Sequence, residues 1–286
     1  QFYVDHYRFP GVNIATSLKR IYPQGNDFAH LVGYVGSISN RDREYVNNKA
    51  YRATHFVGKA GIEQYYEKAL HGNEGVALTQ INASGQIINP IDHTQAQPGK
   101  NLTLTIDSRL QHTAYQLLKG YSGALVAINP NDGSILAMAS NPSFDPNLFA
   151  NGISQKDYQA LLNAKGHPLY NKITRGLYSP GSTIKPFIAI SALSDKYISA
   201  ETSIFDKGWF RLPHTKHIYH DWRYNGHGWV NVFKAITVSC DTFFYQLAVQ
   251  MGIEALDRDF ALFGFGEPTG LDLPNESSGL VPTPNW

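Results

Sequence analysis

Three things are scarce in this sequence: cysteine, long apolar runs and an excess of charge of one sign. Cys240 is the single cysteine in 286 residues, so no disulfide can form within the chain, and cysteine usage gives no indication of the compartment. No apolar run approaches the ~18 residues that a membrane-spanning helix needs, and no signal peptide is visible. With 24 basic and 23 acidic residues the net charge is +1, which argues against a nucleic acid as partner.

What is present is an apolar fraction of 42%, enough for a sizeable core, and a length that allows one large or two ordinary domains. The 17 tyrosines and 15 phenylalanines suit a surface that handles sugars and peptides. In the first 100 residues, short β-like runs such as 2–9 and 30–36 alternate with loops. Residues 61–72 predict a short amphipathic helix that ends at Gly72, with Glu63 and Glu67 one turn apart on a solvated face.

The segment after residue 100 predicts helices mixed with an antiparallel hairpin. The Pro-Gly turn within 95–100 is the expected hinge, and 102–106 is the expected strand after it. Asp107 and Ser108 are expected to cap a helix over 109–118. Two apolar runs, 123–129 and 134–139, are joined by an Asn-Asp-Gly turn, which is a strong hairpin signal. This mixture indicates an α+β fold instead of a parallel doubly wound sheet.

The spacing of Ser182 and Lys185 is the first chemical signal. The two residues stand three positions apart, where a loop rich in Gly and Pro leads into the apolar segment 187–193. If that segment is a helix, both side chains lie on one face about a turn apart. A base must take the proton of a serine before it can attack, and burial of this apolar helix on all sides would lower the pKa of Lys185 toward that role. The alternative is an N-capping serine followed by a solvated lysine.

The run from Tyr178 to Pro186 resembles the nucleophile motif of the class B penicillin-binding proteins, the D,D-transpeptidases that cross-link peptidoglycan. The resemblance covers essentially all 286 residues and is strongest to the penicillin-binding protein 2 branch, the transpeptidases of cell elongation in Gram-negative rods. It implies an α+β penicillin-binding-protein transpeptidase domain, serine β-lactamase-like, in residues 101–286. Residues 1–100 would form an elongated β-rich pedestal of the dimerisation type. It also implies a chain truncated at both ends, without its N-terminal membrane anchor.

Ser239-Cys240-Asp241 stands 57 residues after Ser182 and resembles the second motif of the family, Ser-x-Asn, with Asp in the third place. The resemblance implies that Ser239 passes a proton between substrate and Lys185, and that Asp241 hydrogen-bonds Lys185 or the substrate backbone. An ionised Asp241 would favour the protonated lysine and oppose its role as a base. The alternative for these three residues is a polar loop between helices.

Helices are expected on both sides of this motif. Asn231 would cap one that runs to about Val238, and a second would run over 242–250 and close at Gly252. The third motif of the family, Lys-Thr-Gly or Lys-Ser-Gly, does not occur in residues 1–286. In the family that strand lies downstream and supplies one amide of the oxyanion hole, while the backbone N–H of Ser182 would supply the other.

A dense group of potential metal ligands precedes Cys240. The group comprises Asp206, His214, His217, His220, Asp221 and His227. Its spacing is not that of a CxxC pair, and a lone cysteine is commonly a small buried hydrophobe. The resemblance implies that Asp206, Asp221, His227 and Cys240 form the zinc site found in some members of the branch, with the other three histidines as rival ligands. Four protein ligands leave no open position, so such a zinc would be structural and would hold the second motif in register.

The resemblance implies acyl transfer. Lys185 would deprotonate Ser182, which would attack the D-Ala-D-Ala carbonyl of a peptidoglycan stem peptide, and the amine of a neighbouring stem would resolve the acyl-enzyme. β-Lactam antibiotics would acylate the same serine. The implied partners are a SEDS-family glycosyltransferase and elongation-complex scaffold proteins. The implied location is the bacterial inner membrane, with the catalytic domain in the periplasm.

Three other functions stay open at this point. The first is the septal transpeptidase of the same class, although the Ser-Cys-Asp motif and the 206–227 insertion favour the elongation enzyme. The second is a penicillin-binding sensor or scaffold that is acylated but does not turn over. The third is a β-lactamase, which needs a deacylating base such as the Glu of class A enzymes, and no residue can be assigned that role.

Overall fold

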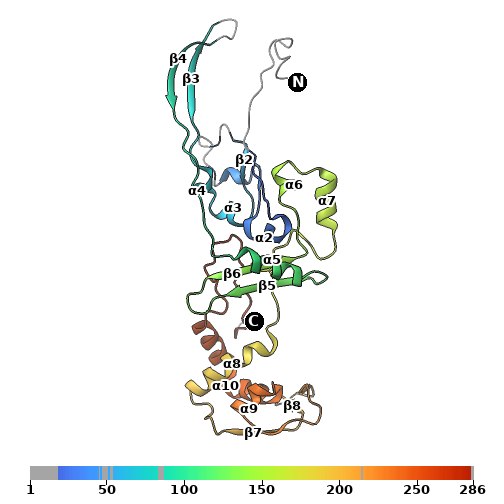
Figure 1. The fold of residues 1–286 in the computed structure, drawn as a ribbon. Coiled ribbons are helices and arrows are strands. Elements are labelled where there is room, and N and C mark those ends of the chain that lie inside the picture. Colours follow the sequence, from blue (N-terminus) through green and yellow to red (C-terminus); the bar gives the residue numbers. More distant parts are fainter. Residues whose placement is uncertain are drawn as a thin grey trace. The chain divides into compact units, whose positions relative to one another are not determined.

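The computed structural model describes residues 19–44, 46, 51, 54–82, 87–213 and 215–284. The chain divides into two compact units, which we call unit 1 (Gln1–Arg175 with Asp272–Asn275) and unit 2 (Gly176–Leu271 with Glu276–Trp286). Figure 1 shows the course of the chain through both. The strand expected at 2–9 lies outside the described residues.

The first half of unit 1 consists of short elements: η2 (Gly25–Asp27), α2 (Ala29–Val32), β1 (Val35–Ser37), η3 (Asp42–Glu44), β2 (Phe56–Gly58), α3 (Gly61–Tyr65) and α4 (Glu67–His71). β1 and β2 pair antiparallel. The helix predicted over 61–72 is confirmed. It is interrupted at Tyr66 and ends at Gly72, whose φ of 73° suits glycine. The strand predicted over 30–36 is confirmed only from Val35 onward, because the residues before Gly33 close a turn of helix.

The solvated face predicted for Glu63 and Glu67 is wrong. Glu63 is only 4% exposed, and its carboxylate lies 2.8 Å from Arg20 Nε and accepts the hydroxyl of Tyr22. Glu67 accepts the backbone N–H of Gly58 at 2.7 Å. Burial raises the pKa of Glu63, and the Arg20 guanidinium opposes that rise. The two carboxylates therefore fix the helix to the segments that surround it.

A long hairpin follows, made of β3 (Val76–Ile81) and β4 (Ile87–Thr94). The strands pair antiparallel with two irregularities in the register, and Figure 1 shows them extending away from the other labelled elements of unit 1. Apolar side chains on both strands are more than half exposed: Val76, Leu78, Ile88 and Ile91. The segment 95–100 after the hairpin is tied back to α4, where Lys100 N–H donates to Ala69 O at 2.8 Å.

α5 (Ser108–Leu117) packs on the hairpin of β5 (Gly123–Ile128) and β6 (Ile135–Asn141), as the sequence predicts. Asp107 caps the helix by accepting the N–H groups of Arg109 and Leu110. Gln111 is completely buried and exchanges both amide hydrogen bonds with the backbone of Met138. The strand predicted over 102–106 is wrong. The segment bends at residue 105, where the Thr105 hydroxyl donates to Ile135 O at 2.7 Å, and the next backbone contact with β6 is Asp107 N–H to Leu136 O.

Two further helices complete unit 1, α6 (Asn147–Ala150) and α7 (Gln155–Asn163). The rings of Tyr34, Phe144 and Phe149 pack together beside them. The hydrogen bond from the Gln111 amide to Asp27 O joins segments on the two sides of the domain boundary predicted near residue 100. That boundary stays a prediction.

Unit 2 contains η4 (Gly181–Ile184), α8 (Lys185–Ser194), β7 (Ser203–Asp206), β8 (Trp209–Arg211), β9 (Ile218–His220), β10 (Gly228–Asn231), α9 (Val232–Thr237) and α10 (Asp241–Leu262). β7 pairs with β10 and β8 with β9, both antiparallel. Both helices predicted around the second motif are confirmed. Asn231 caps α9 through the N–H of Lys234, and α10 is broken at Gly252, whose φ is 76°.

The core of unit 2 lies between α8, α9 and α10, with Ala192, Ala235, Phe243 and Leu247 among its fully buried members. The prediction that α8 is buried on all sides is wrong, because Ile190 on its outer face is 54% exposed. The mixture of helices and antiparallel strands confirms the α+β class. In the described parts of the chain, every helix is too short or too polar to cross a membrane.

His30, on α2, makes the stability of unit 1 depend on pH. Burial, with the charge of Lys172 nearby, lowers its pKa from 6.5 to about 4. Between these two values the unfolded chain binds a proton that the folded chain does not, so stability is lost as pH falls from about 6.5 to 4. The loss should reach about 3 kcal/mol.

The measurement is urea denaturation followed by circular dichroism at several pH values. His30→Gln should remove most of this dependence, whereas His93→Gln, at an exposed position, should keep it. Equal curves for wild type and His30→Gln would contradict the prediction.

Candidate active site and metal cluster

Ser182 lies at the surface and Lys185 in the interior, one turn of helix apart. Ser182 is part of η4, a 3-10 turn that leads into α8, and its side chain is exposed. Lys185 is the first residue of α8 and is 7% exposed. Pro186 occupies the first turn of α8, where a missing N–H costs no hydrogen bond. The loop-to-helix arrangement predicted for this motif is present, with the serine on the turn before the α-helix.

Hydrogen bonds connect these two residues to the second motif. Ser239 Oγ donates to Ser182 Oγ at 2.8 Å, and Lys185 Nζ donates to Ser239 Oγ at 3.2 Å and to Ser239 O at 2.8 Å. Lys185 Nζ also lies 2.6 Å from Asp241 Oδ1. The structure therefore brings together all four residues that the sequence singled out, and Ser239 stands between the lysine and the exposed serine.

The backbone of Ser239 is unusual, because its φ is +54°, in the left-handed region that non-glycine residues seldom adopt. This conformation falls between the end of α9 and the start of α10, and it turns the hydroxyl toward Ser182. Trp222 holds the preceding residue from outside: its indole N–H donates to Val238 O at 2.9 Å. Strained backbone at such a site persists only where neighbouring contacts fix it.

The ion pair with Asp241 bears on the chemistry of Lys185. The Asp241 carboxylate pairs with Lys185 Nζ at 2.6 Å, one of the contacts expected from the sequence. The ring of Phe244 lies beside this pair, with its centroid 5.6 Å from Nζ. The hydroxyl of Ser239, bonded to both Lys185 and Ser182, offers a path for a proton between them.

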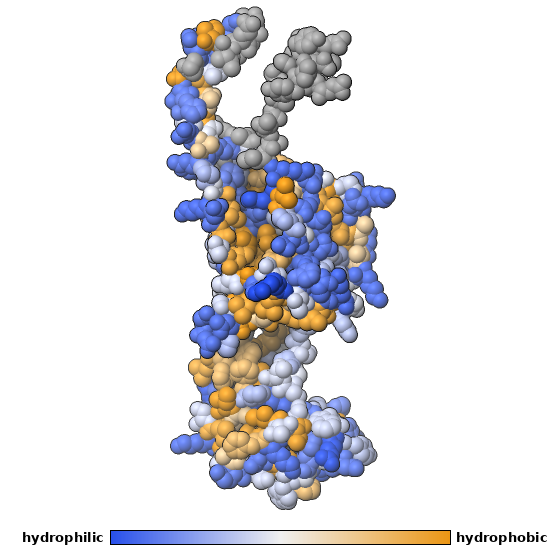
Figure 2. Space-filling view, in the orientation of Figure 1, coloured by the Kyte–Doolittle hydropathy of each residue, from blue (hydrophilic) through white to orange (hydrophobic). Residues whose placement is uncertain are grey.

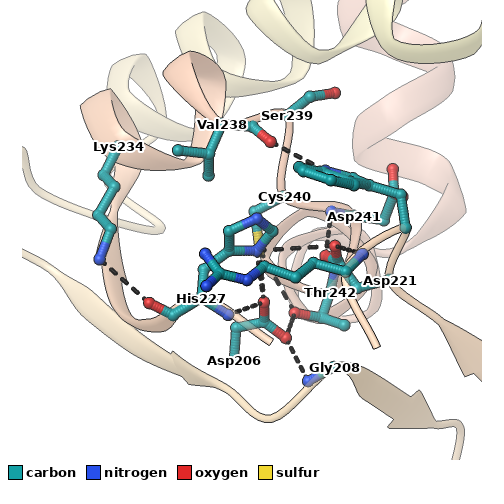
Figure 3. A network of polar contacts seen from close by, with 12 residues as sticks. Asp206, Gly208, Asp221, His227, Lys234, Val238, Ser239, Cys240, Asp241 and Thr242 are labelled. Atoms are coloured by element: carbon teal, nitrogen blue, oxygen red, sulfur yellow. Dashed lines mark hydrogen bonds and ion pairs between the residues drawn. The ribbon is translucent and has the colours of Figure 1, made fainter. Parts of the chain in front are cut away.

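Below this loop lie Asp206, Asp221, His227 and Cys240, all buried (Figure 3). One ligand atom from each lies within 4.8 Å of the others. His227 Nδ1 is 2.8 Å from Asp206 Oδ2 and 3.6 Å from Asp221 Oδ1, while Cys240 Sγ is 3.5 Å from Asp206 Oδ2. We call these four residues the ligand cluster. They come from the end of β7, the residue after β9, the residue before β10 and the residue before α10.

The ligand cluster is connected to the loop that bears Ser239 by the backbone of α10. Asp221 Oδ2 accepts the N–H groups of Asp241 at 2.7 Å and Thr242 at 3.2 Å. Thr242 Oγ1 donates to Asp206 Oδ1 at 2.6 Å. Burial raises the pKa of Asp206, but bonds from Thr242, Gly208 and His227 outweigh it and lower that pKa to about 2. Both carboxylates therefore bind the first turn of the helix that follows Ser239.

Two glycines allow the strands that carry the ligands to approach each other. A Cβ on Gly208 would lie 2.0 Å from Tyr224 O, and one on Gly226 would lie 2.3 Å from Asp206 O. Both have positive φ, 90° and 69°. Any larger residue at either place would separate Asp206 from His227.

The donor set fits zinc. Sulfur, imidazole nitrogen and carboxylate oxygen are the ligands that zinc prefers, and bonds of about 2.0–2.3 Å place tetrahedral ligands about 3.3–3.8 Å apart. The distances between 2.8 and 3.6 Å in the cluster are close to that range. Burial raises the pKa of the Cys240 thiol to about 12, so a bound cation is what would make it a thiolate ligand. These residues suit a closed, structural metal site.

Of the rival histidines, His217 and His220 are exposed and lie outside the ligand cluster, whereas His214 lies outside the described residues. Sequence reasoning missed Thr242, which binds Asp206, and Trp222, which holds the loop. No pattern in the sequence pointed to Trp222, because a tryptophan in an aromatic stretch has no distinctive spacing. Thr242 had one signal, its place directly after Asp241 in the first turn of a helix.

Comparisons with known proteins agree with this geometry. Residues 123–286 match the penicillin-binding protein transpeptidase domain, and residues 1–104 match the penicillin-binding protein dimerisation domain. The chain therefore belongs to the penicillin-binding protein transpeptidase family. It combines both domains, as the class B members expected from the sequence do.

More particular similarity is to enzymes of one branch. The chain is 45% identical over its whole length to peptidoglycan D,D-transpeptidase MrdA of Escherichia coli strain K12, of which it spans 46%. It resembles Pseudomonas aeruginosa PBP2 in complex with WCK 5153 (42% identity, TM-score 0.80, 96% of this chain and 57% of that one). It also resembles Helicobacter pylori PBP2 in complex with MreC (34% identity, TM-score 0.91, 99% and 53%). The chain thus spans about half the length of the relatives it matches.

The buried bond between Thr242 and Asp206 should contribute strongly to the stability of unit 2. Thr242→Val keeps the shape but removes the hydroxyl, and we expect the free energy of unfolding to fall by about 1.5–3 kcal/mol. Residues Trp209, Trp222 and Trp229 lie in unit 2, so tryptophan fluorescence in urea reports its unfolding.

The matched control is Thr237→Val. The Thr237 hydroxyl donates to Phe233 O on the exposed side of α9, so its removal should change the free energy of unfolding by about 0.5 kcal/mol or less. Equal effects of the two substitutions would contradict a special role for Thr242.

Proposed function

We propose that this chain carries the acyl-transfer centre of a peptidoglycan D,D-transpeptidase that cross-links stem peptides during cell elongation. The hydrogen-bonded series Ser182, Ser239, Lys185 and Asp241 is the observation that carries the proposal. The names of the relatives support the reaction, and their elongation branch supports the cellular process.

In the proposed mechanism Ser182 is the nucleophile. Its proton moves through Ser239 to Lys185 as Oγ attacks the carbonyl between the two D-Ala residues of a stem peptide. The backbone N–H of Ser182 would stabilise the developing oxyanion, together with an amide from the Lys-Thr-Gly strand that residues 1–286 do not contain. The lysine returns the proton to the leaving D-Ala. The amine of a second stem then displaces the serine and forms the cross-link, and a β-lactam would stop at the acylated serine.

Asp241 would hold the lysine in position in the resting state. Because its N–H is bound to Asp221, Asp241 can move its carboxylate without moving its backbone. Contact between the carboxylate and a bound peptide would weaken the ion pair and leave the lysine able to accept the proton of Ser182.

We also propose that zinc occupies the ligand cluster, held by Asp206, Asp221, His227 and Cys240. Zinc would compensate most of the negative charge of two buried carboxylates and a thiolate and so stabilise the fold of this region. Asp221 would connect the bound zinc to the position of the second motif, because its carboxylate accepts the backbone N–H groups of Asp241 and Thr242.

The proposed setting is the bacterial inner membrane, with this chain on the periplasmic side. A scaffold protein of the elongation complex is a proposed partner, supported by the relative whose structure contains MreC. A SEDS-family glycosyltransferase, which would supply new glycan strands, is a further proposed partner on the basis of the family resemblance.

Ser182→Ala should abolish acylation of the purified protein by a fluorescent penicillin, because no other hydroxyl occupies the end of the relay. The measurement is the fluorescent band on a denaturing gel. Ser194→Ala, an exposed serine at the end of α8, should be labelled like the wild type. Labelling of Ser182→Ala would sink the proposal, and labelling without cross-linking by the wild type would favour a non-turnover sensor.

Protein prepared without chelator should contain one zinc per chain by elemental analysis, and Cys240→Ser should contain little or none. A chelator should lower the Tm of the wild type by several degrees and leave that of Cys240→Ser unchanged, because only bound metal stabilises by linkage. His217→Ala should retain the metal. Absence of metal from the wild type, or a chelator effect that survives Cys240→Ser, would rule the site out.

A further inference from the structure

The two-stranded sheet of β8 and β9 presents two chemically different faces. In the antiparallel register Trp209 stands opposite His220, and Arg211 stands opposite Ile218. Because side chains alternate along a strand, these four residues share one face. The intervening residues, Phe210 and Tyr219, occupy the other face.

The face with Phe210 and Tyr219 packs against α10. The ring centroids of Phe210 and Tyr219 lie 6.3 and 5.7 Å from that of Tyr245. This contact fixes the sheet to the helix that begins at the second motif. The packing on Tyr245 therefore fixes the position of the sheet, and the face that bears Trp209 and His220 is available to bind a ligand.

That opposite face is the floor of a pocket of about 430 Å³, which lies within the range of small-ligand sites, about 300–1,000 Å³. Its lining consists of Lys207, Trp209, Ile218, His220, Tyr224 and Asn225. Figure 2 shows hydrophilic colours on the visible surface around β8, which Figure 1 labels. The pocket lies in unit 2 and includes none of the proposed catalytic or metal-binding residues.

Lys207 is the cationic residue of the lining, and Arg211 lies on the same face of the sheet. Lys207 Nζ lies 3.4 Å from the centroid of the Trp209 ring, and the Arg211 guanidinium carbon lies 5.8 Å from the same ring. The lining contains no carboxylate, and the two carboxylates adjacent to it in sequence, Asp206 and Asp221, are buried and bonded to the backbone. An anionic group in the pocket would thus meet Lys207 without repulsion from the lining.

The pocket also has an aromatic rim with hydrogen-bonding groups beside it. Tyr224 is 81% exposed, far more than a packing role requires, and Asn225 and His220 offer amide and imidazole groups. An aromatic ring covers the C–H face of a sugar, while amide and imidazole groups bind its hydroxyl and N-acetyl groups. A flexible peptide would use none of this planarity.

We propose that this pocket binds one sugar ring of the peptidoglycan glycan strand, of the N-acetylated kind whose ether substituent ends in a free carboxylate where no stem peptide is attached. Tyr224 lies over the ring, Asn225 and His220 bind its polar groups, and Lys207 attracts the acidic substituent. This assignment rests on the proposed function, because it takes the glycan to be part of the substrate.

The position of the pocket beside the ligand cluster connects glycan binding to the proposed active site. Lys207 directly follows Asp206, and His220 directly precedes Asp221, so the pocket adjoins the ligand cluster in sequence. Asp221 in turn binds the backbone N–H of Asp241. A glycan strand held here through a sugar without a stem peptide would keep the peptides of its other sugars close to the protein, which raises their effective concentration.

The test is calorimetric or saturation-transfer binding of N-acetylmuramic acid to the purified protein. We expect millimolar binding, weaker binding of N-acetylglucosamine, which lacks the carboxylate, and a loss of about tenfold in Tyr224→Ala. Lys207→Gln should remove the preference for the acidic sugar. Tyr121→Ala makes the same change at a similarly exposed site in unit 1 (72%) and should bind like the wild type.

Each outcome of these binding measurements either supports or overturns the proposal. No binding of the acidic sugar, or equal binding by Tyr224→Ala, overturns the pocket assignment. Binding of an acyl-D-Ala-D-Ala peptide that Tyr224→Ala weakens, without binding of the sugar, replaces the glycan by the stem peptide. Acylation of Ser182 by a fluorescent penicillin is measured on the same samples. Acylation without sugar binding refutes only the pocket, and sugar binding without acylation refutes only the transpeptidase proposal.

Discussion

Two carboxylates buried together, Asp206 and Asp221, are the constraint on which unit 2 depends. Removing such charges from water is costly unless each is paired and hydrogen-bonded. Here they accept bonds from His227, from Thr242 and from the backbone that begins α10. The same bonds that satisfy the two charges therefore place the serine loop, so the stability of this region and the geometry of the site have one origin.

Above these carboxylates, three hydrogen-bonded side chains lead from the interior to the surface. Lys185 is buried, Ser239 lies at an intermediate depth and Ser182 is exposed. A gradient of this kind keeps the Lys185 side chain away from water while the Ser182 hydroxyl stays accessible. The left-handed backbone of Ser239 is the cost of bringing its hydroxyl between them.

Local signals were enough to predict much of this structure. The cap at Asp107, the hairpin around the Asn-Asp-Gly turn, the cap at Asn231 and the break at Gly252 all depend on neighbours within a few residues. The failures concern contacts distant in sequence. Glu63 meets Arg20 across 43 positions, 102–106 lacks a partner strand, and Ile190 is exposed because the core covers only one face of α8. The grouping of the site residues followed from the family resemblance and from the Ser-x-x-Lys spacing, whereas the roles of Thr242 and Trp222 exist only in three dimensions.

The close approach of Gly208 and Gly226 has a consequence for how this insertion can evolve. Neither position tolerates a side chain, and the ligands next to them are fixed by the two carboxylates, so the base of the insertion has almost no freedom. The described residues that connect β8 to β9 include none of the cluster ligands. Changes in the length of the insertion should therefore accumulate between these two strands, which would let related proteins diversify this surface while the architecture beneath it stays constant.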